Sequence, residues 1–389
     1  MKQLKKDITF IYMDSAEKNM YRPVAEEAKR RGYNVTLTDN KFAKCEIGFY
    51  CQHTNFPQYS RFSLIMLHDI IQQYSNWPDL WLREPWNKYD IGFLPSAQWV
   101  RNWNACSQYY YANPRIGVFE TGWPKADPYA GIDKKTYKNC FNQKHGLDNS
   151  RRTILYAPSW ENDHKQDDFV QAMLKLDVNI LIKQAAVDCN QFPGMYHAIQ
   201  EMHDLHKNLE HVTILPPETN IFDAILAADV LVSDESSTMC EAVMMGVPAV
   251  SVSDWLIPDV QPSRFPRSDY PFVFMTRKNQ LTDFIRELLD DYRQTAEKVD
   301  GFRLEMFGES GGCASMIMDI VDDCVAGKEI RYPVLAPAQK CRVPSGKLYY
   351  HLVEGAKREL YSNYCQRSKV LNTAYRILRN LKHVLKRNG

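Results

Sequence analysis

Short apolar segments alternate along this chain with stretches in which apolar residues recur at helical spacing. In the first third, the apolar segments predict buried strands at residues 8–12, 34–38, 47–51, 64–67, 91–94 and 116–119. Helical patterns lie between several of them, such as residues 24–31, which end at Gly32, a frequent helix terminator. Strands that alternate with helices are typical of a parallel sheet, so the sequence predicts an α/β fold.

A polar segment, residues 133–152, interrupts this alternation before it resumes. The second series of predicted strands is 153–157, 179–182, 212–215, 230–232, 249–252 and 272–275. Helices are expected at 168–175, 196–206, 222–227, 281–292 and 313–325. The restart predicts two Rossmann-like domains, residues 1–135 and 151–330, which face a central cleft and are followed by a helical tail, residues 331–389.

One strand-to-helix junction in the second half carries candidate chemistry. The strand predicted at 230–232 runs directly into Ser233, Asp234, Glu235, Ser236 and Ser237, and the next helix ends at Gly246-Val247-Pro248. The first N–H groups of a helix, together with its dipole, form a site for anions such as phosphate. Junctions of this kind face the crevice of nucleotide-binding α/β domains. We therefore expect Ser236 and Ser237 to contact phosphate, the alternative being that one of them only caps the helix.

Charge is distributed unevenly along the chain. The net charge is +1, but residues 366–389 hold seven Lys and Arg and no acid, which leaves 41 basic and 47 acidic residues elsewhere. Apolar residues in this segment, including Val370, Leu371 and Leu378, recur at helical spacing. We expect a helix that binds an anionic membrane surface, or else one that packs on the protein body or on a second chain. The basic residues are concentrated in this tail rather than distributed along a groove, so nucleic-acid binding is not expected.

The remaining composition limits the class of protein. No apolar run approaches the roughly 20 residues of a membrane-spanning helix, and the N-terminus does not resemble a signal peptide. The ten cysteines show no CxxC pair and no HExxH sequence is present, so we expect reduced thiols in a cytoplasmic protein and no structural metal site. A group of tryptophans forms either a carbohydrate-stacking surface or part of the core, namely Trp77, Trp81, Trp86, Trp99 and Trp103.

Five segments, in order along residues 47–325, resemble the CDP-glycerol glycerophosphotransferase family. They are Leu67-His68-Asp69, Gly122-Trp123-Pro124-Lys125-Ala126-Asp127, Leu155-Tyr156-Ala157-Pro158-Ser159-Trp160, Lys183-Gln184-Ala185-Ala186 and Asp234-Glu235-Ser236-Ser237. Members of this family are GT-B-type enzymes that build teichoic acids and related capsule polymers. The chain departs from the family pattern at Ala185, where a second histidine is usual, and at Glu235, which replaces a tyrosine.

Transfer from a nucleotide diphosphate requires a base near the acceptor hydroxyl and positive or N–H donors around the phosphates. His68 follows a predicted strand, so its imidazole is expected at the cleft as the base, although it could be a structural loop histidine. Asp69 would orient that ring or act as an ordinary loop acid. Lys183, at the end of a strand, and Lys125 are expected to face the donor phosphates, although both could be solvated lysines.

Three further acidic residues belong to the candidate site. Asp234 would coordinate a metal ion or simply begin the turn, and Glu235 would hold a ribose or polyol hydroxyl. Glu241 lies one helical turn after Ser237 and resembles the glutamate with which many GT-B enzymes hold the ribose of the donor; otherwise it is a capping or solvent-facing residue. No cofactor is required by these motifs, although a divalent cation could accompany the diphosphate.

The sequence therefore predicts a transferase. It would move glycerol phosphate, or a related polyol-phosphate or sugar unit, from a CDP- or UDP-activated donor to a cell-envelope glycan or lipid-linked acceptor. Its expected location is the cytoplasm, peripheral to the inner face of the membrane. The alternatives are a sugar-nucleotide glycosyltransferase or epimerase of GT-B fold, and a non-catalytic nucleotide-binding scaffold, because a fold alone does not establish chemistry.

Overall fold

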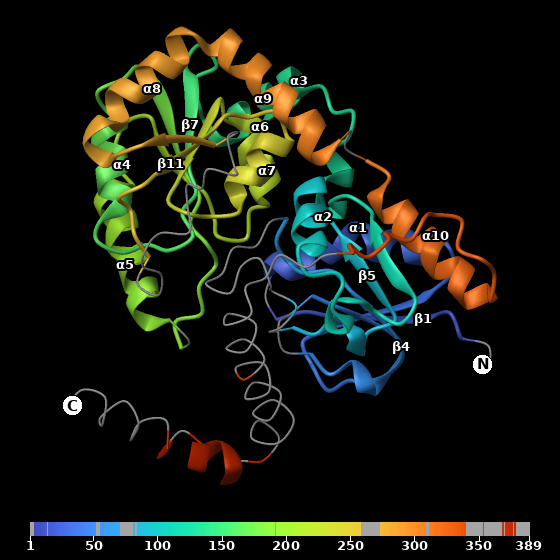
Figure 1. Ribbon diagram of the computed structural model, residues 1–389. Coiled ribbons are helices and arrows are strands. Elements are labelled where there is room, and N and C mark those ends of the chain that lie inside the picture. The colour runs from blue at the N-terminus through green and yellow to red at the C-terminus, as the bar shows by residue number, and fades with distance from the viewer. Residues whose placement is uncertain are drawn as a thin grey trace.

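The structure is a computed structural model that describes residues 4–13, 15–51, 55–70, 81, 84–190, 192–257, 273–308, 311–339, 353, 368, 370–375 and 377–378. Within them the chain forms two six-stranded sheets, and every pairing of neighbouring strands is parallel. Helices flank both sheets, and the two units lie side by side (Figure 1). The predicted pair of Rossmann-like units is confirmed.

The sheet of the first unit has the strand order β2-β1-β3-β4-β5-β6. Its strands are β1 Asp7–Ile11, β2 Asn34–Thr38, β3 Cys45–Tyr50, β4 Ser60–Ile65, β5 Ile91–Leu94 and β6 Gly117–Glu120. Helices α1 Ser15–Arg30 and α2 Ala97–Asn104 belong to this unit. After β6, the 3-10 segment η5 Pro124–Tyr129 leads the chain toward the second unit.

The second sheet has the order β12-β11-β10-β7-β8-β9. Its strands are β7 Arg152–Tyr156, β8 Val178–Ile182, β9 Val212–Ile214, β10 Val230–Ser233, β11 Ala249–Val252 and β12 Val273–Thr276. Its helices are α4 Lys165–Met173, α5 Pro193–His206, α6 Ile221–Ala227, α7 Thr238–Met244, α8 Leu281–Asp290 and α9 Tyr292–Phe307. Leu155 of β7 pairs with Leu231 and Leu181 of its neighbours, so buried aliphatic side chains run across the sheet.

Every predicted strand is present, and its ends agree with the prediction to within four residues. Central strands such as β10 and β11 are buried apolar runs, which parallel sheets favour. Three helices were not predicted. The polar segment 133–152 contains α3 Lys134–His145. Asp133 caps the start of this helix by accepting a hydrogen bond from the Lys135 N–H, and Gly146 terminates the helix in a left-handed conformation. The helix expected at 281–292 is two helices, α8 and α9, and α2 had no predicted counterpart.

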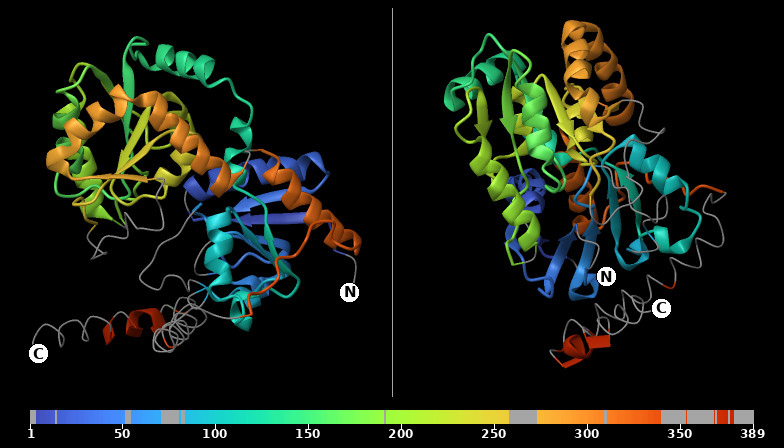
Figure 2. Two further views of the ribbon diagram at one scale, coloured as in Figure 1. Left: turned by 45° about the horizontal axis from the view of Figure 1, so that its top comes forward. Right: turned by 90° about the vertical axis from the view of Figure 1, so that its left-hand side faces the viewer.

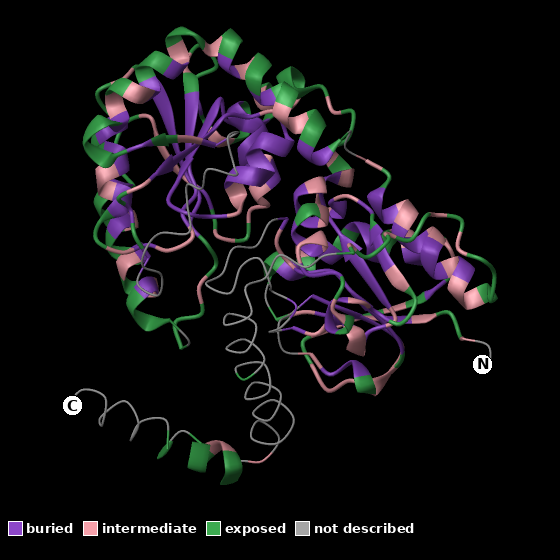
Figure 3. Ribbon diagram, in the orientation of Figure 1, coloured by how far each residue is buried: buried purple, intermediate pink, exposed green. Residues whose placement is uncertain are grey.

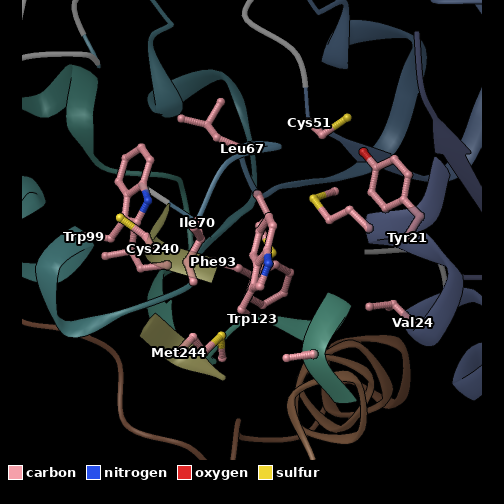
Figure 4. Close-up of a cluster of buried hydrophobic side chains, with 14 of the residues drawn as sticks. Tyr21, Val24, Cys51, Leu67, Ile70, Phe93, Trp99, Trp123, Cys240 and Met244 are labelled. Carbon is pink, nitrogen blue, oxygen red and sulfur yellow. The ribbon is translucent and has the colours of Figure 1, made fainter. Parts of the chain in front are cut away.

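The core of the first unit continues into the second without a break. Purple strands mark the buried centre of both sheets in Figure 3. Figure 4 shows Cys240 and Met244 of α7 among side chains of the first unit that include Trp99, Trp123 and Ile70, all members of one buried apolar cluster. The two units therefore share an apolar interface along α7.

Tryptophans of the first unit contribute to this core. Trp81, Trp86, Trp99 and Trp103 are each at most 1% exposed, so these four are core residues and form no carbohydrate-stacking surface. Trp77 lies outside the described residues.

The chain returns to the first unit after α9. Helix α10 Cys313–Ala326 packs on α1, where Arg31 pairs with Asp319 at 2.6 Å and Asp322 at 2.9 Å (Figures 1 and 2). The predicted limit at residue 330 therefore assigned α10 to the wrong unit, because its apolar pattern does not indicate which core it covers. Beyond α10, Leu335 donates its N–H to the Val118 carbonyl of β6, so this segment also lies on the first unit.

Little of the predicted tail can be described. Residues 370–375 and 377–378 are helical, and the rest of residues 340–389 lies outside the described part apart from single positions. Among the helices that the structure describes, none has the length and apolar character needed to cross a bilayer.

Candidate functional site

A cavity of about 440 Å³ lies between the two units. It is lined by α1 and the loops after β4 and β6 on the first unit, and by the loops after β7, β8, β9 and β10 on the second. Because carboxyl ends of parallel strands meet at one edge of each sheet, both units bring their loops to the same crevice. Eight of the nine predicted site residues line this cavity, namely His68, Asp69, Lys125, Lys183, Glu235, Ser236, Ser237 and Glu241.

The His68 ring is held between acceptors on both sides. Its Nδ1 lies 3.4 Å from the Cys51 carbonyl oxygen and 3.8 Å from Oε1 of Glu17, and its Nε2 lies 3.3 Å from Oδ2 of Asp69. A carbonyl can only accept, so the Nδ1 position carries a proton in this hydrogen bond. Nε2 is therefore the nitrogen that can exchange a proton at the cavity, with Asp69 beside it.

A hydrogen bond crosses the cavity at Asp69. The Ser237 hydroxyl donates to Oδ1 of Asp69 at 3.2 Å, so a residue of the second unit touches the acid that contacts His68. Ser237 occupies the N-cap position of α7 but makes no side-chain capping bond, so its hydroxyl is not a plain helix cap. Ser236 accepts from the Thr238 hydroxyl at 2.9 Å, which places two hydroxyl groups together at the cavity wall.

Lys183 follows β8 and is largely buried. Its ammonium donates to the carbonyls of Gln184 at 2.9 Å and Pro217 at 2.8 Å. Burial, and to a lesser extent the positive charge of Lys125, lower the pKa of Lys183 to about 8. A bound anion would counter both effects, so this amine is suited to receive a phosphate.

Lys125 and Glu241 form an ion pair between the two units. Lys125 Nζ donates to Oε1 of Glu241 at 2.8 Å, and Trp123 Nε1 donates to the same oxygen at 3.1 Å. The two charged side chains are nearly buried. Both line the cavity, but the ammonium predicted to face phosphate is engaged by a carboxylate.

Asp234 is the one predicted site residue that does not line the cavity. Its buried carboxylate pairs with Lys165 at 3.1 Å and accepts from the Ser159 N–H at 2.8 Å and from the Glu235 N–H at 2.6 Å. These bonds tie the loop after β7 to the loop after β10. The structure thus gives Asp234 a place in the scaffold beneath the cavity, while Glu235 lies in the cavity wall.

Sequence reasoning missed two groups of lining residues. Ser15, Ala16 and Asn19 come from the first turns of α1, which the sequence places in a helix only from residue 24 because Pro23 reads as a break. Thr219 and Asn220 follow β9 and lie outside the predicted motifs. A local signal existed for the second group, since Asn220 is the N-cap of α6 and accepts from the Phe222 N–H.

Potential metal ligands do not gather at this site. In the described part of the chain, no group of three or more His, Cys, Asp or Glu side chains is arranged to hold a metal ion.

Comparison with known proteins assigns a family to this geometry. Residues 83–317 match the profile of the CDP-Glycerol:Poly(glycerophosphate) glycerophosphotransferase family, which is more than half of the chain. The chain belongs to this family. It is therefore a glycerophosphotransferase-like transferase, and the predicted resemblance is confirmed. No protein among the curated sequences matches the chain.

Solved structures share the fold at low sequence identity. The wall teichoic acid polymerase TagF is 15% identical, with a TM-score of 0.59 over 83% of this chain and 89% of that chain. The UDP-GlcNAc 2-epimerase of Neisseria meningitidis is 13% identical, with a TM-score of 0.56 over 82% and 100%. MnaA of S. aureus, solved with UDP, is 13% identical, with a TM-score of 0.56 over 85% and 99%. The GT-B-like fold is thus confirmed, but transferases and epimerases share it, so it is the family match that favours the transferase.

Proposed function

We propose that this enzyme transfers glycerol phosphate from CDP-glycerol to a hydroxyl group of a cell-envelope glycan or lipid-linked acceptor, as in teichoic acid synthesis. The family match supports the donor class. One observation carries the assignment of sites: His68 and Asp69 of the first unit and Ser236 and Ser237 of the second line the same cavity, with Ser237 touching Asp69.

The proposed reaction is a displacement at phosphorus. The acceptor hydroxyl oxygen forms a bond to the phosphorus that carries glycerol, and the bond from that phosphorus to the bridging oxygen breaks. CMP leaves with the electron pair, and the hydroxyl proton passes to Nε2 of His68. Catalysis of such transfers consists mainly of positioning and charge stabilisation, which the cavity walls can supply.

Donor contacts are assigned to the second unit. Ser236 and Ser237 offer hydroxyl groups to the diphosphate, and Lys183 offers an ammonium that burial makes receptive to an anion. Four carboxylates and two ammonium groups line the cavity, namely Asp69, Glu218, Glu235, Glu241, Lys125 and Lys183. This balance is negative, and among the described residues no three acidic, His or Cys side chains are arranged to hold a metal ion. We therefore propose that a divalent cation enters bound to the diphosphate and offsets part of its charge.

Acceptor activation is assigned to the first unit. A hydroxyl approaching Nε2 of His68 enters the space beside Asp69, whose carboxylate lies 3.3 Å from that nitrogen. When the diphosphate binds, the Ser237 hydroxyl donates its single proton to a phosphate oxygen in place of Asp69. Asp69 then stabilises the imidazolium that forms when His68 takes the proton. Glu235 lies in the same cavity wall, and we propose that it contacts a hydroxyl of the glycerol or ribose.

The decisive experiment is a turnover assay of the His68→Gln variant with CDP-glycerol and a lipid-linked acceptor. We expect a loss of about 100-fold or more in kcat, the usual range for removal of a general base. His197→Gln is the matched control, because His197 is exposed and does not line the cavity. Equal rates for His68→Gln and the parent would refute the assignment of the base.

Binding measurements separate this function from its rivals. Calorimetry that shows tight binding of CDP and none of UDP supports the glycerophosphotransferase, whereas the reverse favours a sugar-nucleotide enzyme. A parent protein that binds CDP but turns over no activated donor is a nucleotide-binding scaffold.

We propose further that the basic tail holds the enzyme at an anionic membrane surface, which would place it at the inner face of the cell membrane near a lipid-linked acceptor. The described part of this helix exposes four apolar side chains, which supports their insertion into a membrane interface; they are Val370, Leu371, Ile377 and Leu378. Deletion of residues 367–389 should abolish co-sedimentation with anionic vesicles, whereas neutral vesicles should bind neither form. Unchanged binding after the deletion would rule out this role.

A further inference from the structure

The loop after β6 is fixed in place by the first unit. Asp127 of η5 accepts from the Cys313 N–H at 3.2 Å and from the Ala314 N–H at 2.6 Å, the first residues of α10. Gly122 begins the loop at a φ of +77°, and a β-carbon there would lie 2.7 Å from Sγ of Cys313. The segment that carries Trp123 and Lys125 is therefore held by α10 as well as by α1, on which η5 packs.

This loop reaches Glu241 on the other unit with two donors. Trp123 Nε1 and Lys125 Nζ both donate to Oε1, at 3.1 Å and 2.8 Å, and Trp123 is only 1% exposed. Lys125 also lies over the ring of Phe222, 5.4 Å from its centroid, so its side chain is placed by the second unit as well. Among the described residues, Oε2 of Glu241 has no hydrogen-bond partner, and the residue lines the cavity.

We infer that Lys125 and Trp123 are positioning residues for Glu241, and that they act on the donor through this carboxylate rather than by touching its phosphates. This inference rests on the proposed function. Two N–H donors on one oxygen fix the rotamer of the carboxylate and leave the other oxygen for a hydroxyl group of the bound ligand. The ammonium also neutralises a nearly buried carboxylate that would otherwise repel the diphosphate.

The consequence is a donor site that is complete only when the two units are in contact. Glu241 belongs to the second unit, whereas Trp123 and Lys125, which donate hydrogen bonds to it, belong to the first. A lysine that held phosphate directly would act whether or not residue 241 were charged. The loss of donor affinity on removal of the Lys125 charge should therefore depend on Glu241 if Lys125 positions that carboxylate, and should be independent of Glu241 if Lys125 binds phosphate.

A double-mutant cycle on CDP-glycerol binding, measured by calorimetry, separates these roles. Lys125→Met should weaken binding about tenfold in the parent, and by less than about twofold in the Glu241→Gln background, since coupled neighbours are non-additive by such amounts. Lys125→Arg should restore much of the affinity, because a guanidinium can also donate to Oε1. Trp123→Phe, which keeps the ring but deletes the N–H, should follow the same pattern with a smaller loss. Lys207→Met, at an exposed position outside the cavity, is the control.

An equal loss from Lys125→Met in both backgrounds would overturn the inference and assign Lys125 to the phosphates. If the parent binds no CDP-glycerol, the proposed function fails, whereas the positioning of Glu241 by Lys125 is tested separately by the same cycle on urea unfolding. Coupling between positions 125 and 241 in the unfolding free energy is then expected, and additive effects would refute it.

Discussion

The Lys165–Asp234 pair offers a direct test of how the cavity loops are held. Both side chains are at most 1% exposed, and Lys165 Nζ lies 3.1 Å from Oδ2 of Asp234 and 3.1 Å from the Trp160 carbonyl oxygen. Lys165→Met keeps the length of the side chain but removes its charge. The carboxylate of Asp234 would then be buried without a counter-charge beneath the loops after β7 and β10.

Removing one partner of a buried ion pair typically costs about 3–5 kcal/mol. Here the carboxylate keeps the N–H of Ser159 at 2.8 Å and that of Glu235 at 2.6 Å, so part of its hydrogen bonding survives. We therefore expect Lys165→Met to lower the free energy of unfolding by about 3 kcal/mol, the lower end of that range. Urea unfolding followed by circular dichroism measures this loss.

The matched control is Lys207→Met, because Lys207 pairs with Asp204 at 2.7 Å with both side chains more than half exposed. Exposed pairs contribute only about 0–1 kcal/mol. Adding Asp234→Asn to Lys165→Met removes the uncompensated charge and should recover part of the lost stability. A Lys165→Met variant no less stable than the Lys207→Met control would refute the scaffold role of this pair.

Two further predictions concern the cavity and its loop. Affinity for CDP-glycerol, measured by calorimetry, should fall as the pH rises through about 8. Burial and Lys125 lower the pKa of Lys183 to about 8, and its neutral amine binds an anion less well. Lys183→Arg should remove this dependence, and an unchanged fall in that variant would refute the assignment of Lys183 to the phosphates. Gly122→Ala should lower the unfolding free energy in urea by about 1–3 kcal/mol more than Gly146→Ala, because both glycines have positive φ but only the Gly122 β-carbon would meet Cys313. Equal losses would show that the loop yields to the added methyl group.

The sheets could be predicted because their central strands, such as β5, β10 and β11, are buried and read as apolar runs. The edge strands β2 and β9 are only partly buried, and they carry β-branched residues that favour strands. The helices that were missed carry weak signals. Helix α3 buries only Phe141 and Asn142, so its pattern resembles a linker, and Pro23 obscures the first turns of α1. The unit to which α10 belongs depends on Arg31 and its carboxylate partners, which lie almost 300 residues away along the chain.

The candidate site divides in the same way. Strand ends predicted which loops meet at the cavity, since parallel strands carry their functional residues at one edge. Contacts between the units could not be predicted, because Ser237 lies 168 residues from Asp69 and Glu241 lies 116 residues from Lys125. The buried position of Asp234 also has no local signal, since an acid at the end of a strand can face either the cavity or the scaffold.

Helix α7 explains why these contacts between the units occur together. Ser237, Cys240, Glu241 and Met244 follow one another at steps of three, one and three residues, so they form one stripe along the helix. Cys240 and Met244 pack in the apolar interface with the first unit, while Ser237 and Glu241 reach Asp69 and Lys125. The packing of the apolar pair thus sets the position of the polar pair. Because Asp69 contacts His68, the distance between the proposed base and the proposed phosphate site is fixed by the same face of α7, and separation of the units would disrupt both at once.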